Sequence, residues 1–314
     1  MTEFDLICIG RSSLDLFAEN IGATFADVTG FKAFVGGSPT NVCVMAGRLG
    51  LKTAMITGLG DDYTRDFILK FLYEEGVSTD YITLKRGMQT NTVMVALQPP
   101  TDMQFVALHA NNADLALTID DMHKAPLATS RALLFSGMCL MQEPSRSATQ
   151  AAAETARNGG AIVLMDLDYR VPMWSDARIY GITTRLTLNL VDIVLGTEEE
   201  VMAAASATDL DVAIERLKNI AHSAVIVKKG ERGAEAHLKN GEVISVPAFK
   251  VDVVNFLGAG DAFAGAFAYA HLNGWDWGRA LTFANAAGAL IVSRHGTANA
   301  MPTLAEIDAL IGQP

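Results

Sequence analysis

A glycine-rich segment, Gly258-Ala259-Gly260-Asp261, leads directly into the helical pattern Ala262–Leu272. Small residues let backbone amides approach a ligand closely, and the N-terminus of a helix carries partial positive charge. Such a turn can hold a phosphate or a developing oxyanion, while the carboxylate of Asp261 can take a proton from a substrate hydroxyl. The segment is equally typical of a turn in which Asp261 only caps the helix.

Two further glycine segments lie early in the chain, at Gly36–Asn41 and Gly58–Asp62. Gly36 and Gly37 permit a close backbone approach to a ligand, and the amide of Asn41 offers a donor and an acceptor to a polyol. Taken alone, the first segment is better explained as an ordinary capped loop. The second is better explained as a strand-to-helix turn with acidic residues at the helix start.

The elements that must position these segments alternate along the chain. Continuous apolar runs alternate with helical patterns, which is typical of a mostly parallel sheet covered on both faces. We therefore predict a doubly wound α/β fold. The predicted strands are Phe4–Ile9, Thr53–Thr57, Leu133–Ser136, Ala161–Asp166, Ile193–Leu195 and Ala224–Lys228. The predicted helices are Asn41–Leu49, Tyr63–Glu75, Pro144–Asn158, Glu198–Ala205, Val212–Ala221, Ala262–Leu272 and Arg279–Ser293.

Two regions, residues 12–35 and 89–112, break this alternation because their patterns predict strands without intervening helices. We expect them to form a small β lid over one end of the main sheet. No repeat, low-complexity tract or linker divides the chain, so residues 1–314 are expected to form a single domain.

The composition limits the partners and the compartment. With 24 basic and 35 acidic residues the net charge is −11, which argues against nucleic acid or an anionic membrane surface as a partner. The N-terminus lacks a signal-peptide pattern, and no apolar run is long enough to span a bilayer. The three cysteines form no CxxC pair and are expected to be buried thiols. We therefore expect a cytoplasmic protein.

In their order and spacing, the segments Gly10–Asp15, Gly36–Asn41, Gly58–Asp62 and Gly258–Asp261 resemble the PfkB, or ribokinase-like, carbohydrate kinase family. The resemblance covers essentially the whole chain. It implies a ribokinase-like fold and transfer of the γ-phosphate of ATP, with Mg²⁺, to a hydroxyl of a sugar or sugar acid. It also implies a possible homodimer, since lids of this family often pair.

The resemblance assigns roles to the residues of the acceptor side. Asp261 matches the base that deprotonates the acceptor hydroxyl. The positions that form the anion hole for the transferred phosphoryl group are Gly258, Ala259 and Gly260. The positions that hold sugar hydroxyls are Asp15, Gly36, Gly37 and Asn41.

On the nucleotide side, the resemblance implies that Lys228, Gly230 and Gly233 border the phosphates and that Asn285 lines the adenine pocket. Glu199 matches the acidic end of an Asn-x-x-Glu motif that organises Mg²⁺ through water. The chain departs from the family pattern at Gly196, where many members have the Asn of this motif. It also has Asn255-Phe256 where Asp-Thr is common, which leaves dependence on a monovalent cation such as K⁺ open.

Within the family, the chain most resembles the 5-dehydro-2-deoxygluconokinases. The segments that carry this resemblance are Gly10–Asp15, Asn111–Leu117, Asp166–Arg170 with Trp174, Gly196–Glu200 and Ser293–Gly296. Arg170 follows a predicted strand at its carboxyl end, where ligands bind in open α/β sheets. Its guanidinium could bind a sugar-acid carboxylate in a bidentate manner, or it could form a salt bridge with Asp166 or Asp168 that orders the loop.

Several alternatives stay open. Members that act on keto-acid sugars often have Tyr and Arg in the lid strand, where this chain has Leu108 and His109. The acceptor could therefore be 2-keto-3-deoxygluconate, fructose or another ketose, an inositol or a nucleoside. A non-catalytic sugar or nucleotide sensor would be expected to lack Asp261. A dinucleotide-dependent oxidoreductase would be expected to have a GxGxxG fingerprint after the first strand, and the chain has none there.

Overall fold

The computed structural model of the protein describes residues 2–98, 102–108 and 111–312. Within these residues, nine strands form the main sheet in the order β13-β12-β11-β10-β9-β8-β1-β4-β5. The parallel strands are β1 (Leu6–Ile9), β4 (Thr53–Gly60), β5 (Ile82–Lys85), β8 (Ala132–Ser136), β9 (Ile162–Asp166), β10 (Ile193–Thr197) and β11 (Ala224–Lys228). Two antiparallel strands, β12 (Ala234–Leu238) and β13 (Val243–Val246), complete one edge.

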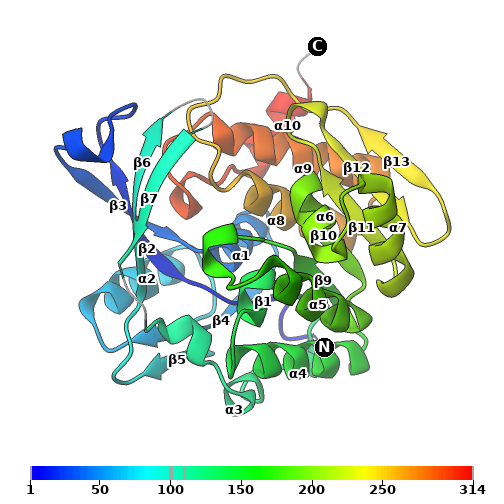
Figure 1. Ribbon diagram of the computed structural model, residues 1–314, viewed down its shortest axis with the longest axis horizontal. Helices are drawn as coiled ribbons and strands as arrows, with labels where there is room; N and C mark the ends of the chain where they lie inside the picture. The colour runs from blue at the N-terminus through cyan, green and yellow to red at the C-terminus, as the bar shows by residue number, and fades with distance from the viewer. Residues whose placement is uncertain (1, 99–101, 109–110, 313–314) are drawn as a thin grey trace.

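Alternating side chains of the central strands enter two separate cores. Leu6 and Cys8 of β1 belong to one core, and Ile7 and Ile9 belong to the other. The first core is covered by α1 (Ser38–Arg48), α2 (Tyr63–Glu74), α8 (Ala259–Leu272), α9 (Trp277–Val292) and α10 (Leu304–Ile311). The second is covered by α3 (Ile119–Met122), α4 (Ser145–Asn158), α5 (Ala177–Thr187), α6 (Glu198–Ala205) and α7 (Leu210–Ile220). Helices thus flank the sheet on both faces (Figure 1), and the predicted fold class is confirmed.

A second, smaller sheet stands to one side of the main sheet (Figure 1). In the described part of the chain it contains four strands, in the order β3 (Phe31–Gly36), β2 (Ser13–Ala18), β6 (Asn91–Gln98) and β7 (Asp102–Ala107). These strands fall within the two regions that lacked predicted helices. Phe17, Phe34, Val95 and Leu97 form the small core of this sheet, against which Leu257 packs.

Some elements were not predicted. The antiparallel edge β12–β13 and the helix α5 have no counterpart among the predicted elements. In β12, buried residues alternate with half-buried ones, because this strand lies near the edge of the sheet. Cys8, Cys43 and Cys139 are free and buried, which confirms the prediction of buried thiols. No helix of the described residues is long and apolar enough to cross a membrane.

Candidate active site

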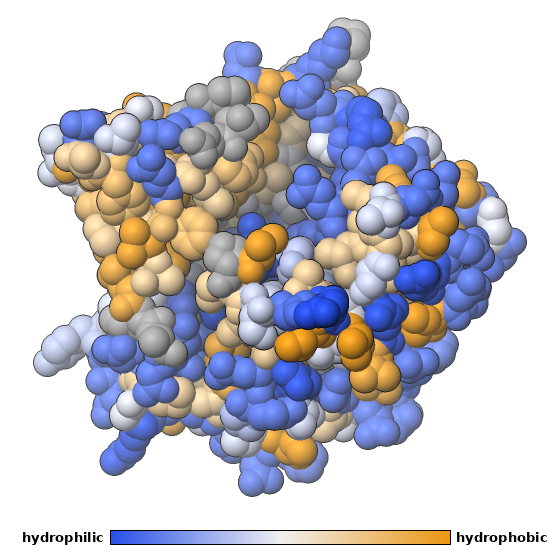
Figure 2. Space-filling view, in the orientation of Figure 1, coloured by the Kyte–Doolittle hydropathy of each residue, from blue (hydrophilic) through white to orange (hydrophobic). Residues whose placement is uncertain are grey.

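A cavity of about 400 Å³ lies beside the carboxyl ends of β1, β8 and β9, between the main sheet and the small sheet. The surface is hollowed in this part of the molecule (Figure 2). The cavity is lined by side chains from distant parts of the sequence, among them Arg11, Asp15, Asn41, Asp168, Arg170 and Asp261. The position at the carboxyl ends of parallel strands is where ligands bind in open α/β sheets.

Asp261 lies in the first turn of α8 and lines this cavity. The helix N-cap is Gly258, which has φ 84° and makes no side-chain cap, so Asp261 does not serve as the cap. Instead, the amide of Asn41 donates from Nδ2 to Asp261 Oδ2 at 2.7 Å. Burial raises the pKa of Asp261, and hydrogen bonds from Asn41 and Ser38 oppose this shift. The site therefore holds a desolvated carboxylate beside uncapped amides of a helix N-terminus.

The absence of side chains at Gly36 and Gly37 allows their backbone to pack closely against Asp15 and Arg11. A Cβ at Gly36 would lie 1.8 Å from Asp15 Oδ2, and a Cβ at Gly37, where φ is 98°, would lie 2.2 Å from the carbonyl oxygen of Arg11. The carboxylate of Asp15 therefore packs directly on the backbone of Gly36. Ser13 donates to Asp15 Oδ1 at 2.7 Å, yet burial dominates and raises the pKa of Asp15 to about 6.

Lys228 ends β11 and reaches across the sheet edge toward the start of α8. Its Nζ lies 2.9 Å from Asp166 Oδ2 and would lie 2.9 Å from a Cβ at Gly260. Burial raises the pKa of Asp166, and Lys228 opposes that effect. A mostly buried cation, 13% exposed, thus lies next to the helix N-terminus where the resemblance implies a phosphoryl group.

Arg170 donates from Nε to Asp168 Oδ1 at 2.8 Å, and 53% of its side chain is exposed. Asp168 has φ 37°, a rare value for a non-glycine residue, and also accepts from Ser136 Oγ at 2.8 Å. Burial alone would raise the pKa of Asp168, but Arg170 and Ser136 hold it below its ordinary value. Arg170 therefore makes the loop salt bridge and lines the cavity at the same time.

Other predicted site residues lie outside this cavity. Gly230 has φ 58°, and a Cβ there would meet nothing within 4 Å, whereas a Cβ at Gly233 would lie 2.0 Å from the carbonyl oxygen of Val246. The Asn285 amide donates to the carbonyl oxygen of Pro247 at 3.0 Å.

The acidic start of α6 contains three carboxylates, Glu198, Glu199 and Glu200, of which Glu198 is paired with Arg232. Glu199 is exposed. The neighbouring Glu200 accepts from the backbone amides of Tyr169 and Thr197 at 3.2 and 2.7 Å. The second of these bonds belongs to the capping box of α6.

The segment Gly58–Asp62 has the structural role that was weighed for it. Asp62 is the N-cap of α2 and accepts hydrogen bonds from the amides of Thr64 and Arg65. It also accepts from the amide of Thr90 at 2.8 Å, which fixes the start of the second small-sheet region. The segment therefore supports the cavity without lining it.

Among the lining residues that received no role from the sequence are Arg11, Ser13, Asn91 and Tyr169. Arg11 and Ser13 belong to the segment that carries Asp15, so their position after the first strand was a usable signal. Asn91 and Tyr169 join the cavity only through tertiary packing. Leu108, one of the two altered lid positions, is exposed, and His109 lies outside the described residues.

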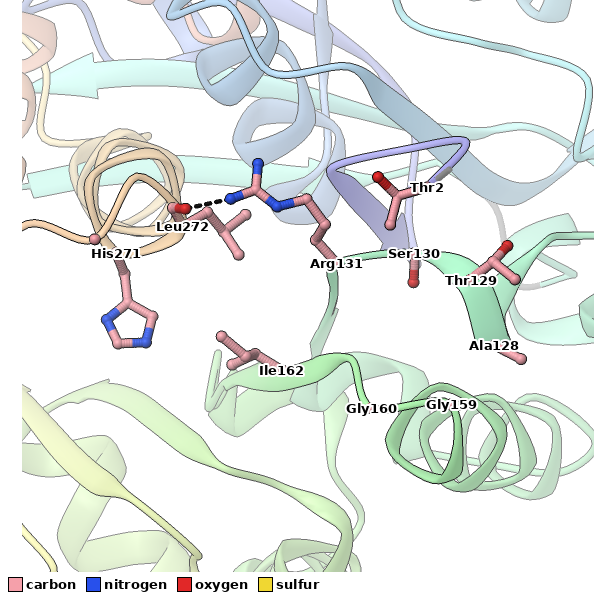
Figure 3. Close-up of a pocket in the computed structure, with 11 residues that line it drawn as sticks. Thr2, Ala128, Thr129, Ser130, Arg131, Gly159, Gly160, Ile162, His271 and Leu272 are labelled. Carbon is pink, nitrogen blue, oxygen red and sulfur yellow. Dashed lines mark hydrogen bonds between the residues drawn. The ribbon is translucent and has the colours of Figure 1, made fainter.

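A second cavity of about 400 Å³ lies at the amino ends of the same strands, β1, β8 and β9 (Figure 3). Figure 3 shows Arg131 extending toward the carbonyl of Leu272, the last residue of α8. Arg131 also donates from Nη1 to Asp5 Oδ1 at 2.7 Å. The guanidinium of Arg131 is therefore already hydrogen-bonded to acceptors of the protein itself.

Comparisons with known proteins agree with this geometry. The model of the pfkB family carbohydrate kinases matches residues 4–304. A 5-dehydro-2-deoxygluconokinase of Shouchella clausii is 33% identical over 312 residues, covering 98% of this chain and 96% of that protein. One of Geobacillus thermodenitrificans is 34% identical, with 98% and 93% covered.

Solved structures are also similar. A fructokinase of Xylella fastidiosa with bound ATP has a TM-score of 0.86 at 26% identity, covering 98% of this chain and 97% of that one. The match to the family model spans nearly the entire chain, and the relatives are similar along almost their whole length. The chain therefore belongs to the pfkB family of carbohydrate kinases.

Proposed function

We propose that the protein phosphorylates 5-dehydro-2-deoxygluconate, a sugar acid, with ATP as the phosphate donor. The observation that carries this proposal is that one cavity contains both a half-buried candidate base, Asp261, and a guanidinium, Arg170, suited to a carboxylate. The 5-dehydro-2-deoxygluconokinases that the chain resembles support the choice among sugar acids.

The residues of the cavity divide the reaction between them. Asp261 takes the proton of the acceptor hydroxyl, whose oxygen bonds to the γ-phosphorus as the bond to the β-phosphate oxygen of ATP breaks and ADP leaves. The amides of Gly258, Ala259 and Gly260 stabilise the charge on the phosphoryl oxygens, with Lys228 beside them. Asn41 holds the carboxylate of Asp261 toward the cavity.

The acceptor sugar lies between the small sheet and α1. Asp15 accepts hydrogen bonds from its hydroxyls. Gly36 leaves room for the Asp15 carboxylate, and Gly37 leaves room for the carbonyl of Arg11. The amide of Asn41, already bound to Asp261 through Nδ2, has a buried Oδ1 without a hydrogen-bond partner in the described residues. A substrate hydroxyl supplies the missing donor.

ATP binds along the carboxyl ends of β10 and β11. Open space around Gly230 suits a phosphate, and Lys228 supplies positive charge. Gly233 is required for packing against Val246, and Asn285 borders the adenine from α9. The use of ATP and the free buried thiols support a cytoplasmic location.

Mg²⁺, when bound, would offset the negative charge of the ATP phosphates. In the described ranges no group of three His, Cys, Asp or Glu side chains is placed to hold a metal. The exposed carboxylate of Glu199, at the start of α6, suits contact with a water of the metal rather than direct ligation.

The site of a monovalent cation is not matched by the residues present. Asn255 is 1% exposed, its Nδ2 donates to the carbonyl oxygen of Gly296 at 3.0 Å, and its Oδ1 accepts from the amide of Leu257. The position thus has a neutral amide, with both of its polar atoms hydrogen-bonded, in place of a carboxylate. Turnover is therefore expected to be the same in K⁺ and in a buffer with a bulky organic cation, and strong activation by K⁺ would contradict this.

A second copy of the chain is proposed to cover the outer face of the small sheet. The cavity-lining residues alternate along β6 and β7, so Met94 and Val106 lie on the face away from the cavity. Val106 is 45% exposed, and apolar side chains gather over this sheet (Figure 2). Light scattering is expected to give a dimer for the wild type and a monomer for Val106→Asp; a monomeric wild type would refute the pairing.

Coupled ADP release across sugar acids, ketoses, inositols and nucleosides tests the function itself. The highest kcat/KM is expected for 5-dehydro-2-deoxygluconate. Arg170→Ala is expected to raise KM for the sugar acid far more than KM for fructose, because only the acid has a carboxylate that Arg170 can bind. Arg178, which is 85% exposed and paired with Asp176, provides the control Arg178→Ala. Equal effects of Arg170→Ala on both substrates would remove the carboxylate contact.

A further inference from the structure

One ion pair in the cavity wall has no part in the chemistry above. Arg11, two residues after β1, donates from Nε to Asp114 Oδ2 at 2.9 Å. Only 16% of the Arg11 side chain and 4% of the Asp114 side chain are exposed. Removing two charges from water costs much of what their attraction returns, so such a pair is weak evidence for a stabilising role. Its position in the wall of a ligand cavity indicates a different use.

The backbone on both sides of this pair is held in place. Thr40 Oγ1 donates to the carbonyl oxygen of Arg11 at 2.9 Å, and the backbone of Gly37 packs on the same carbonyl. Asp114 lies in the short helix Ala113–Ala116. The backbone of Gly58 packs against this helix so closely that a Cβ at Gly58 would lie 2.2 Å from the carbonyl oxygen of Ala113. A guanidinium fixed in this way loses little conformational entropy when a ligand binds.

Much of the hydrogen-bonding capacity of the two cavity arginines remains unused. Arg11 and Arg170 each engage an aspartate through Nε, and a guanidinium has five N–H donors. Arg11 Nη2 is buried and finds no acceptor among the residues that the structure describes. In a family whose members differ in acceptor, a buried guanidinium with spare donors suits an anionic ligand oxygen.

Asp168 links the two arginines electrostatically. It is hydrogen-bonded to Arg170. Burial lowers the pKa of Arg11, but the charges of Asp114 and Asp168 outweigh this and raise it. Asp168 is therefore close enough to act on both guanidinium groups, and all three residues line the same cavity, near the ends of β1 and β9. Asp261 approaches the same cavity from α8.

We propose that Arg11 is a specificity-determining residue that binds the carboxylate of a sugar-acid substrate together with Arg170. This inference rests on the proposed function and extends it by naming a second residue for the acidic end of the substrate. The Asp114 side chain acts as a positioning residue, because it orients the Arg11 guanidinium through Nε. The acid group then lies by β1 and β9, and the reacting hydroxyl lies by Asp261.

The test compares Arg11→Gln and Arg11→Lys with the wild type on 5-dehydro-2-deoxygluconate and on fructose. Loss of a charge-assisted hydrogen bond predicts that Arg11→Gln raises KM for the acid by about 10- to 100-fold, with kcat changed less than about threefold. KM for fructose is expected to stay nearly unchanged. Arg11→Lys is expected to recover only part of the loss, because an ammonium lacks the planar fork. Arg178→Gln is the matched control on an exposed arginine.

Arg11→Gln leaves Asp114 buried without its cation, so thermal unfolding is measured for every variant. The double variant Arg11→Gln/Asp114→Asn removes both charges and is expected to fold like the wild type while keeping the raised KM for the acid. An unchanged KM for the acid in this folded double variant would overturn the inference. So would equal increases in KM for the acid and for fructose.

Calorimetric binding of the sugar acid separates this inference from the proposed function. If the wild type binds the acid without turning it over, and Arg11→Gln weakens that binding, then the proposed function fails and the role of Arg11 stands. If wild type and Arg11→Gln turn over the acid with the same KM, then the role of Arg11 fails and the proposed function stands. A wild type that does not bind the acid at all overturns both.

Discussion

The two cavities at opposite ends of β1, β8 and β9 are similar in volume and different in chemistry. The helix α8 runs between them, with Asp261 at its start in one cavity and Leu272 at its end in the other. At the end of α8, Arg131 binds the carbonyl of Leu272, which is where a cation is favourable. At the start of α8, the amides face a cavity and have no side-chain cap.

This difference follows from the direction of the chain. The helix α8 runs antiparallel to these strands, so its amide donors lie at the carboxyl ends of the strands and its carbonyl acceptors lie at their amino ends. At the carbonyl end of α8, Arg131 is already hydrogen-bonded to Asp5 and to the carbonyl of Leu272. The donor end instead contains Asp15, Asp166 and Asp261, whose pKa values burial raises. Perturbed carboxylates that cluster in a cavity are typical of functional sites.

The largest expected effect tests whether chemistry is confined to the cavity at the start of α8. Asp261→Asn removes the base and is expected to lower kcat by about a thousandfold, while ATP still binds. Turnover is measured by ADP release and ATP binding by calorimetry. The control is Asp5→Asn, which changes the carboxylate that Arg131 binds near the other cavity and is expected to keep the wild-type kcat. Wild-type turnover by Asp261→Asn would refute the base assignment.

A smaller effect is expected from Gly36→Ala, because the new Cβ would lie 1.8 Å from Asp15 Oδ2. Asp15 must move, and a displacement of about 1 Å in a binding group can cost about 100-fold in kcat/KM. The matched control is Gly278→Ala in α9, where the new Cβ would meet its nearest neighbour at an ordinary 3.4 Å. Equal kinetics for the two variants would mean that Asp15 does not position the sugar.

The pH dependence of kcat/KM and of the free energy of unfolding tests the role of the buried carboxylate of Asp15. Burial raises the pKa of Asp15 from 3.8 to about 6, so kcat/KM is expected to fall about tenfold per pH unit below pH 6 as Asp15 takes a proton. The folded protein holds this proton more tightly than the unfolded chain does. The contribution of Asp15 to the free energy of unfolding is therefore present below pH 3.8 and is lost as the pH rises to about 6. Asp15→Asn should remove both dependences, and an unchanged profile would exclude Asp15 as their source.

The smallest effect is expected at the other cavity. Arg131→Gln loses the Asp5 ion pair and weakens the contact with the end of α8, so the free energy of unfolding is expected to fall by about 1 kcal/mol. Urea unfolding measures this change. The kinetic constants should remain within twofold of the wild type. A large loss of turnover in a folded Arg131→Gln protein would mean that the two cavities are coupled.

The sequence predicted most of the elements near the site. The strands that became β1, β8, β9, β10 and β11 are continuous apolar runs, so their pattern was clear. The edge strands β12 and β13 were missed because their burial comes from neighbours that a local pattern does not contain. Asp261 was indicated by the small residues before it, but its contact with Asn41 joins residues 220 positions apart.

The sequence by itself determined the α/β class, the buried thiols and the glycine segments from which the site is built, because these depend on local periodicity and residue type. The tertiary structure decided which interpretation applies to each segment. It made Asp62 a helix cap and brought Asp261 to Asn41. It also paired Arg11 with Asp114, which lie in segments more than 100 residues apart in the sequence. Those outcomes depend on burial and on contacts between distant parts of the chain, and no local pattern encodes them.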